Sequence, residues 1–260
     1  MDLGLTGRTA FVAASSQGLG YACARSLARE GAAVTLNGRD EAKLAAAAAA
    51  LEQEVPGARV RHVTADVTTA AGRARITSAL PDVDVLVTNG AGPPPGRLED
   101  WDEDALVGAL RANAVPAVEL MRAYVPGMRA RRFGRIVNIT SAMVKSPAPD
   151  MGLSTSARAA LTAVSKSISK DVAADGVTVN NLLPERFDTP RQEFMARRLV
   201  AAEGIDRDEA FRRIASTVAA QRLGRPEEFG DACAFLCSAQ AGYISGQNLQ
   251  LDGGSYGGLL

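Results

Sequence analysis

Short apolar runs alternate with longer helix-like stretches along the whole of this 260-residue chain. The apolar runs are rich in β-branched residues, as buried strands are, and occupy residues 10–14, 33–36, 60–63, 83–88, 135–140, 177–183 and 248–251. The stretches between them have helical periodicity and occupy residues 21–30, 41–54, 105–131, 156–174 and 227–238. This alternation predicts right-handed βαβ units. It therefore indicates a doubly wound α/β fold, with a seven-stranded, mainly parallel sheet covered by helices on both faces.

The chain reads as a single domain over residues 1–260. Its hydrophobic content of 47% is enough for one sizeable core, and no internal segment resembles a linker. Residues 185–221 interrupt the strand rhythm after the sixth predicted strand. We expect this segment to form a helical excursion that covers a substrate site.

Composition excludes several classes of protein. The 29 basic and 29 acidic residues balance, which argues against nucleic-acid partners and anionic membrane surfaces. No apolar run approaches the roughly 20 residues that span a bilayer. His62 is the only histidine, so a serine–histidine triad would have to be built around it, and a typical metal site lacks histidine ligands. Three cysteines are too few for a disulfide framework. We expect a cytoplasmic protein that binds no metal, membrane or nucleic acid.

A glycine-rich turn follows the first predicted strand and leads directly into a helix. In a doubly wound, Rossmann-like sheet this is where a dinucleotide pyrophosphate meets a helix N-terminus. The expected contacts come from Ala13, Ser15, Ser16, Gln17, Gly18, Leu19 and Gly20. Arg39 ends the second strand region, where a binder of the ribose 2′-hydroxyl usually places a carboxylate. This favours NADP(H) over NAD(H), although Asp40 follows at once and leaves NAD(H) open.

Six segments in order resemble the short-chain dehydrogenase/reductase family over nearly the whole chain. They are the turn at 13–20, Asp66-Val67, Asn89-Gly90-Ala91, Asn113, Ser141 and the carboxyl-terminal stretch 222–254. The likeness is strongest to reductases of 3-oxoacyl groups carried on acyl carrier protein. The resemblance implies adenine contacts at Asp66 and Val67, and further cofactor contacts at Asn89, Gly90, Ala91, Arg158, Pro184, Phe187 and Thr189. It also implies a small-molecule or acyl-thioester substrate and a homodimer or homotetramer.

The catalytic pair of that family is replaced. Where the family has Tyr-x-x-x-Lys, this chain has Ser154 and Arg158. A serine hydroxyl is shorter and far less acidic than a phenol, and a guanidinium with a pKa above about 12 does not relay protons. The resemblance leaves Ser141 to hydrogen-bond the oxyanion, Asn113 to hold a water chain and Arg158 to contact ribose hydroxyls.

Three other positions bear on the chemistry. Lys145 lies four residues beyond Ser141 and is our candidate for a substitute acid, because burial can lower a lysine pKa towards neutrality. The alternative is an exposed loop lysine. Ala14 stands where the family turn has its first glycine, which costs roughly 1–2 kcal/mol if the position needs a positive φ. Glu185 replaces the glycine of a Pro-Gly pair, and either disturbs the nicotinamide end or points into solvent.

Taken together, the sequence predicts an NAD(P)(H)-dependent oxidoreductase that interconverts a carbonyl and an alcohol, with a 3-oxoacyl thioester or related ketone as substrate and a non-standard proton donor. Two alternatives stay open because fold alone does not decide function. One is a non-catalytic dinucleotide-binding or sensor protein that has lost its acid. The other is a non-redox lyase on the same scaffold.

Overall fold

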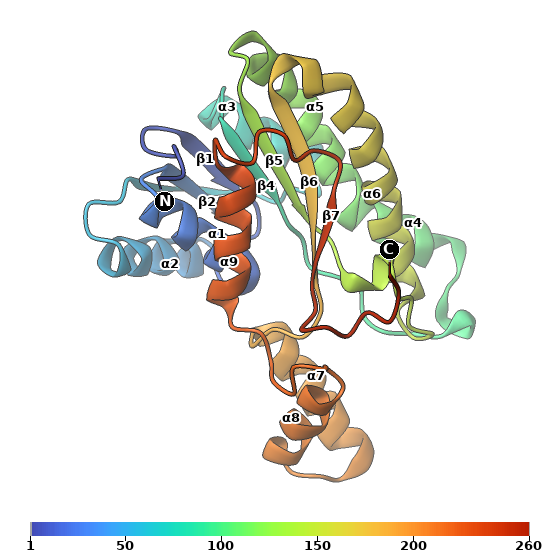
Figure 1. The fold of residues 1–260 in the computed structure, drawn as a ribbon. Helices are drawn as coiled ribbons and strands as arrows, with labels where there is room; N and C mark the ends of the chain where they lie inside the picture. The colour runs from blue at the N-terminus through green and yellow to red at the C-terminus, as the bar shows by residue number, and fades with distance from the viewer. Residues whose placement is uncertain (1, 260) are drawn as a thin grey trace.

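The computed structural model describes residues 2–259 and has the predicted doubly wound α/β architecture (Figure 1). Its single sheet has seven strands in the order β3-β2-β1-β4-β5-β6-β7, and every neighbouring pair is parallel. The strands are β1 Thr9–Val12, β2 Ala33–Gly38, β3 Val60–Thr64, β4 Val85–Thr88, β5 Gly134–Ile139, β6 Val177–Pro184 and β7 Asn248–Leu251. The strand order reverses between β1 and β4, so ligands are expected at the carboxyl ends of these strands.

Helices cover both faces of the sheet, as the sequence predicts (Figure 1). The α-helices are α1 Gly18–Arg29, α2 Glu41–Glu54, α3 Ala70–Ala79, α4 Glu103–Asn113, α5 Val115–Ala130, α6 Gly152–Val172, α7 Pro190–Glu203, α8 Arg207–Ser216 and α9 Pro226–Cys237. Short 3₁₀ turns lie at Leu98–Asp100, Ala142–Val144 and Ala173–Asp175. No helix in the described residues is long and apolar enough to cross a bilayer.

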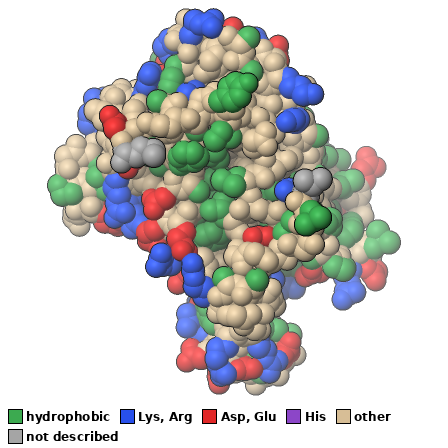
Figure 2. Space-filling view, viewed as in Figure 1, with side chains coloured by type: hydrophobic (Ala, Val, Ile, Leu, Met, Phe, Trp, Pro, Cys, Tyr) green, Lys and Arg blue, Asp and Glu red, His purple; other side chains and the backbone are tan. Residues whose placement is uncertain are grey.

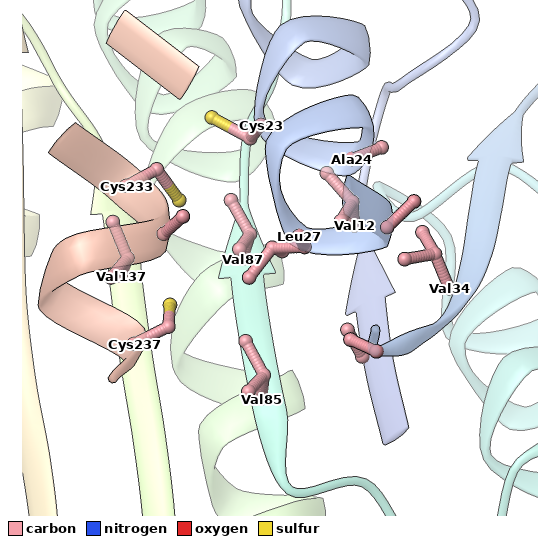
Figure 3. Close-up of a cluster of buried hydrophobic side chains, with 14 of the residues drawn as sticks. Val12, Cys23, Ala24, Leu27, Val34, Val85, Val87, Val137, Cys233 and Cys237 are labelled. Carbon is pink, nitrogen blue, oxygen red and sulfur yellow. The ribbon is translucent and has the colours of Figure 1, made fainter. Parts of the chain in front are cut away.

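Two apolar clusters, one on each side of the sheet, form the core. The first packs α1, α2 and α9 against the strands, and Figure 3 shows Leu27 of α1 beside Val87 of β4 within it. Cys23, Cys233 and Cys237 lie in this cluster as free, buried thiols (Figure 3). The second cluster packs α5 and α6 on the opposite face, with Tyr124 and Met128 fully buried.

The helix predicted over residues 105–131 is wrong as a single element. It breaks into α4, which ends at Asn113, and α5, which begins at Val115. Pro116 lies in the first turn of α5, where its missing N–H costs nothing but where it cannot continue a helix from the residues before it. The sequence also gave no sign of α3, because only Ile76 of that helix is buried.

The excursion at residues 185–221 is helical, as predicted. Helices α7 and α8 project beyond the carboxyl ends of the strands (Figure 1), and a small apolar cluster of their own, built on Ala196, Ala210 and Ile214, holds them together. Figure 2 shows charged side chains of both signs over this projecting part. Its position at the end of the sheet places α7 against the region where a ligand is expected.

Candidate active site

A cleft of about 760 Å³ runs along the carboxyl ends of the strands and under α7. It begins at the turn between β1 and α1 and passes the ends of β2, β4, β5 and β6. Side chains and backbone from nearly every segment that the sequence singled out line it. The predicted cofactor contacts on its wall are Ser16, Gln17, Gly18, Leu19, Arg39, Asp66, Val67, Asn89, Gly90, Ala91, Arg158, Pro184, Phe187 and Thr189.

The turn between β1 and α1 is built for a close approach of backbone to ligand. Ala14 has a φ of 46° and Gly18 a φ of 63°, so both lie in the left-handed region. A Cβ on Gly20 would lie 2.6 Å from the carbonyl oxygen of Ala14, which already accepts a 3.1 Å hydrogen bond from Asn89 Nδ2. The N-cap of α1, Gln17, makes no side-chain cap hydrogen bond, which leaves the helix N-terminus able to bind an anion.

Three residues of the predicted turn, Ala13, Ser15 and Gly20, do not line the cleft wall. Ser15 is completely buried, and its Oγ donates a 2.7 Å hydrogen bond to the carbonyl of Val12 and accepts one of 3.0 Å from the N–H of Asn37. The Ser15 hydroxyl therefore ties β1 to β2 and is not available to a ligand in the cleft. Ala13 lines a small inner pocket instead of the main cleft.

The end of the cleft near β2 and β3 has the features of an adenosine site. Asp40 is the N-cap of α2 and accepts a 3.1 Å hydrogen bond from the N–H of Lys43, so this carboxylate is a helix cap. Arg39 is exposed on the cleft wall, and its Nη1 lies 4.0 Å from Oδ2 of Asp66. Hydrogen bonds from Thr68 lower the pKa of Asp66. With Asp40 turned to the helix, Arg39 is the charged group that would meet a ribose 2′-phosphate.

At the other end of the cleft, Arg158 occupies the space beside the replaced tyrosine. Both Ser154 and Arg158 lie on α6, one turn apart, and Nη1 of Arg158 donates a 2.5 Å hydrogen bond to Ser154 Oγ. Its Nε donates one of 3.0 Å to the carbonyl of Thr140. Ser141 lines the same wall, where its Oγ accepts a 3.2 Å hydrogen bond from the N–H of Met143. Burial, and then the charge on Arg191, lower the pKa of Arg158 to about 10.

Asn113 lies behind this wall. It ends α4, donates a 3.1 Å hydrogen bond from Nδ2 to the carbonyl of Ala109, and lines an inner pocket of about 10 Å³. Arg158 and Asn89 line both this pocket and the main cleft, so the two spaces adjoin. A volume of about 10 Å³ is enough for the centre of roughly one water molecule. The predicted role of Asn113 towards water is compatible with this placement.

Lys145 does not reach the cleft. It follows the 3₁₀ turn Ala142–Val144, its side chain is exposed, and its Nζ lies 5.3 Å from the ring centroid of Tyr256. The expected burial of Lys145 is therefore wrong and the alternative of an exposed loop lysine holds, although Met143 and Ala148 on either side of it line the cleft. No tyrosine is among the described residues that line the cleft or the inner pocket. Tyr21, for example, hydrogen-bonds Glu54, and Tyr124 lies in the core.

Glu185 faces the cleft. Its side chain is 16% exposed, lines the wall beside Pro184, and lies 4.0 Å from Nε of Arg186. Burial raises the pKa of Glu185. The alternative of a carboxylate that points freely into solvent is therefore wrong.

Sequence reasoning predicted that residues 185–221 cover the site but did not identify which residues of α7 line the cleft. Arg191, Gln192, Phe194 and Met195 of this helix all line the wall. No motif marks them, and only the tertiary placement of α7 over the strand ends identifies them. A second residue without a motif, Asn37, supports the turn by accepting from the N–H of Ala14 and donating to the carbonyls of Val63 and Ala65.

Comparisons with known proteins agree with this architecture. A family model described as enoyl-(acyl carrier protein) reductase matches residues 13–256. The chain is 33% identical over 256 residues to dehydrogenase/reductase SDR family member 4 of Bos taurus, covering 96% of this chain and 88% of that protein. It is 31% identical over 252 residues to the 3-oxoacyl-[acyl-carrier-protein] reductase FabG of Haemophilus influenzae, covering 97% of this chain and 99% of that protein.

A solved structure is similar over the full length. L-sorbose reductase from Gluconobacter frateurii, in complex with NADPH and L-sorbose, superposes with a TM-score of 0.94 at 31% identity and covers 100% of both chains. The likeness includes the projecting helices, since the whole of each chain is covered. The cleft described above therefore has a counterpart in a protein that holds a nicotinamide cofactor and a ketose together.

Proposed function

This chain belongs to the short-chain dehydrogenase/reductase family, and we propose that it is an NADP(H)-dependent oxidoreductase that interconverts a carbonyl and an alcohol. One observation carries the proposal. The same cleft joins the turn at the N-terminus of α1 to two hydrogen-bonding groups, Ser141 and Arg158, at the carboxyl ends of β5 and β6. A dinucleotide held at the turn would extend towards those groups.

The residues present fit such a cofactor. Gly18 lines the cleft at the N-terminus of α1 and leaves room there for a pyrophosphate, while Gly20 lets the helix pack closely against the Ala14 carbonyl and Asn89 that form the turn. Arg39 is placed for a 2′-phosphate, which supports NADP(H) over NAD(H). Pro184 and Phe187 line the cleft after β6, and Thr189 lies about 4 Å from where a Cβ on Gly18 would be. A bound nicotinamide would supply the hydride.

We propose that Arg158 and Ser141 stabilise the oxygen of the reacting carbonyl. With a pKa of about 10, the guanidinium of Arg158 stays charged at neutral pH and acts as a hydrogen-bond donor to developing negative charge. Its bonds to Thr140 and Ser154 hold it in place before substrate arrives. Because Lys145 lies outside the cleft, the proton comes from water, for which Asn113 and the adjoining inner pocket provide a site.

The cofactor and the reaction can be tested separately. A fluorescence titration with NADPH and with NADH should show tighter binding of NADPH, and no binding of either would refute the proposal. Consumption of NADPH is then measured with a panel of ketones, ketoses and 3-oxoacyl thioesters. Arg158→Ala should lower kcat by about 10²–10³-fold, the usual effect of removing one oxyanion donor. Lys170→Ala is the matched control, since it removes an exposed cation from the same helix.

One observation favours a second candidate function, a dinucleotide-binding protein without catalysis. Ser154 has no acidic proton to give, and its Oγ already accepts from Arg158. In that case NADPH binds, no member of the panel consumes it, and Arg158→Ala changes only affinity. A lyase would bind NADPH and convert a substrate without any change in its redox state. If Lys145→Ala lowers kcat as strongly as Arg158→Ala does, Lys145 is the acid after all.

The remaining parts of the proposal concern the setting of the enzyme. The substrate is a small molecule or an acyl thioester. By resemblance to its family, we infer a homodimer or homotetramer in the cytoplasm, with no nucleic-acid or membrane partner. Size-exclusion chromatography with light scattering would measure the oligomeric state, and a monomer at micromolar concentration would contradict it.

A further inference from the structure

Three hydrogen-bond donors face the reaction end of the cleft without enough acceptors to satisfy them. They are Arg158 on α6 and the neighbouring residues Arg191 and Gln192 at the start of α7. Gln192 is 4% exposed, and its buried Nε2 has no hydrogen-bond partner within the described part of the protein. A buried amide donor without an acceptor costs free energy. An acceptor from outside the chain would complete the hydrogen bonding of Gln192 Nε2.

The two arginines are similarly short of partners. Within residues 2–259, neither Arg158 nor Arg191 forms an ion pair with a carboxylate: Glu185 lies beside Arg186, and Asp150, which also lines the cleft, pairs with neither arginine. Arg158 donates from Nε to the Thr140 carbonyl and from Nη1 to Ser154 Oγ. Its Nη2 donates to no acceptor within the part of the chain that the structure describes. Arg191 makes one long hydrogen bond, 3.5 Å from Nη2 to the carbonyl of Pro93.

The guanidinium groups of Arg158 and Arg191 line the same cleft. After burial, the charge on Arg191 is a second cause that lowers the pKa of Arg158. Arg191 itself is exposed, so water solvates its charge in the free protein, and an anion between or beside the two cations would stabilise both. The N-terminus of α7 adds to the positive potential, because its N-cap Thr189 makes no side-chain cap hydrogen bond.

An anion bound by these donors would lie beyond the cofactor turn. Thr189 and Pro190 lie about 4 Å from where a Cβ on Gly18 would be, so the α7 N-terminus starts beside that turn. Arg191 then extends away from it, towards Pro93. A Cβ on Gly92 would lie 3.1 Å from Nη2 of Arg158. Both guanidinium groups therefore flank the segment 92–93.

We propose that this end of the cleft binds a carboxylate carried by the substrate, so that the preferred substrates are carbonyl compounds that are also carboxylic acids. The fork of donors on a guanidinium matches the two oxygens of a carboxylate. Arg191 is the specificity-determining residue, and Gln192 supplies a further donor. The inference rests on the proposed function, since it names the substrate class of the same site.

The test compares two substrates that differ by one group. L-sorbose is a neutral ketohexose, and its partner is the hexulosonate in which a carboxylate replaces the terminal hydroxymethyl group farthest from the ketone. With NADPH fixed, kcat/KM should be at least about 10-fold higher for the hexulosonate, as expected for a charge-assisted hydrogen bond. Arg191→Ala should remove most of that preference by raising KM for the hexulosonate, and Arg191→Lys should restore part of it.

Arg197→Ala is the matched control. Arg197 is an exposed arginine of the same helix that pairs with Glu193 and does not line the cleft, and its loss should leave the preference within about 3-fold. Equal kcat/KM for the two substrates, or a preference that survives Arg191→Ala, would overturn the inference while the reductase function stands. It would also be overturned if Arg191→Ala weakened NADPH binding about 10-fold and left the preference unchanged, since Arg191 would then serve the cofactor diphosphate.

A binding measurement decides the inference even if neither compound is reduced. Absence of turnover with both would count against the proposed reaction on these substrates. Calorimetric titration of the NADPH-bound protein should still show that the hexulosonate binds more tightly than L-sorbose, and that Arg191→Ala abolishes the difference. Equal or undetectable binding of both compounds would refute the carboxylate site.

Discussion

The left-handed backbone at Ala14 leads to a prediction in which one substitution has opposite effects at adjacent positions. Ala14 has a φ of 46° in the turn between β1 and α1, where its family has glycine. For an L-residue this conformation costs about 1–2 kcal/mol, while glycine adopts it freely. Replacing alanine with glycine also makes the unfolded chain more flexible, which costs about 0.4–1 kcal/mol. Ala14→Gly should therefore stabilise the protein by about 0.5–1 kcal/mol.

Ala13→Gly is the matched comparison. Ala13 is 1% exposed, packs in the core cluster that contains Phe11, and does not have a positive φ. Glycine there removes a buried methyl group worth about 0.8 kcal/mol and adds the same flexibility to the unfolded chain. We expect Ala13→Gly to destabilise the protein by about 1–2 kcal/mol.

Thermal unfolding of the cofactor-free protein measures both effects. At a fixed protein concentration, Tm should rise by roughly 1–4 °C for Ala14→Gly and fall by roughly 2–8 °C for Ala13→Gly. Bound cofactor or a changed oligomeric state would shift Tm independently, so both are held constant. If Ala14→Gly has a Tm equal to or below that of the wild type, or if both variants shift Tm in the same direction, the strain attributed to this turn is refuted.

Two further predictions concern the cofactor turn and the N-terminus of α9. Gly20→Ala should weaken NADPH binding in a fluorescence titration by about 10-fold or more. The new Cβ would lie 2.6 Å from the Ala14 carbonyl oxygen and 2.9 Å from Asn89 Nδ2, so the turn would have to shift. Unchanged affinity would mean that the turn is not the cofactor site. Hydrogen bonds from Arg222 lower the pKa of Glu228 from 4.5 to about 2. The ionised Glu228 therefore contributes stability that is fully present above pH 4.5 and is lost as the pH falls through about 2. Glu228→Gln should lower Tm at neutral pH by an amount that shrinks over that acid range, and a difference that is the same at every pH would contradict the assignment.

Sequence spacing predicted which side chains lie together where the residues belong to a helix or a strand. Ser154 and Arg158 are four residues apart on a helix, so they had to share a face, and the structure joins them by a hydrogen bond. The same spacing failed for Ser141 and Lys145. Between them the chain makes one 3₁₀ turn, after which the Lys145 side chain is exposed while Met143 lines the cleft, so four residues along a loop do not specify a common direction.

Local signals also could not show which polar side chains serve the fold. Ser15 was predicted as a cofactor contact from its place in a small-residue turn, yet its hydroxyl links the backbone of β1 to that of β2. Arg191 and Gln192 carry no motif, and they belong to the cleft only because α7 folds back over the strand ends. These outcomes depend on contacts between segments far apart in the chain.

The sequence by itself determined the parallel doubly wound sheet, the place of the glycine-rich turn and the loss of the tyrosine and lysine of its family. Each of these follows from the hydrophobic periodicity of a segment or from the residue type at a given position in it, and both are local properties of the sequence. Only the tertiary structure decided that Arg158 fills the space beside Ser154, that Lys145 lies outside, and that Arg191 and Gln192 face the cleft. The physical reason is that burial and electrostatic pairing depend on which distant segments meet.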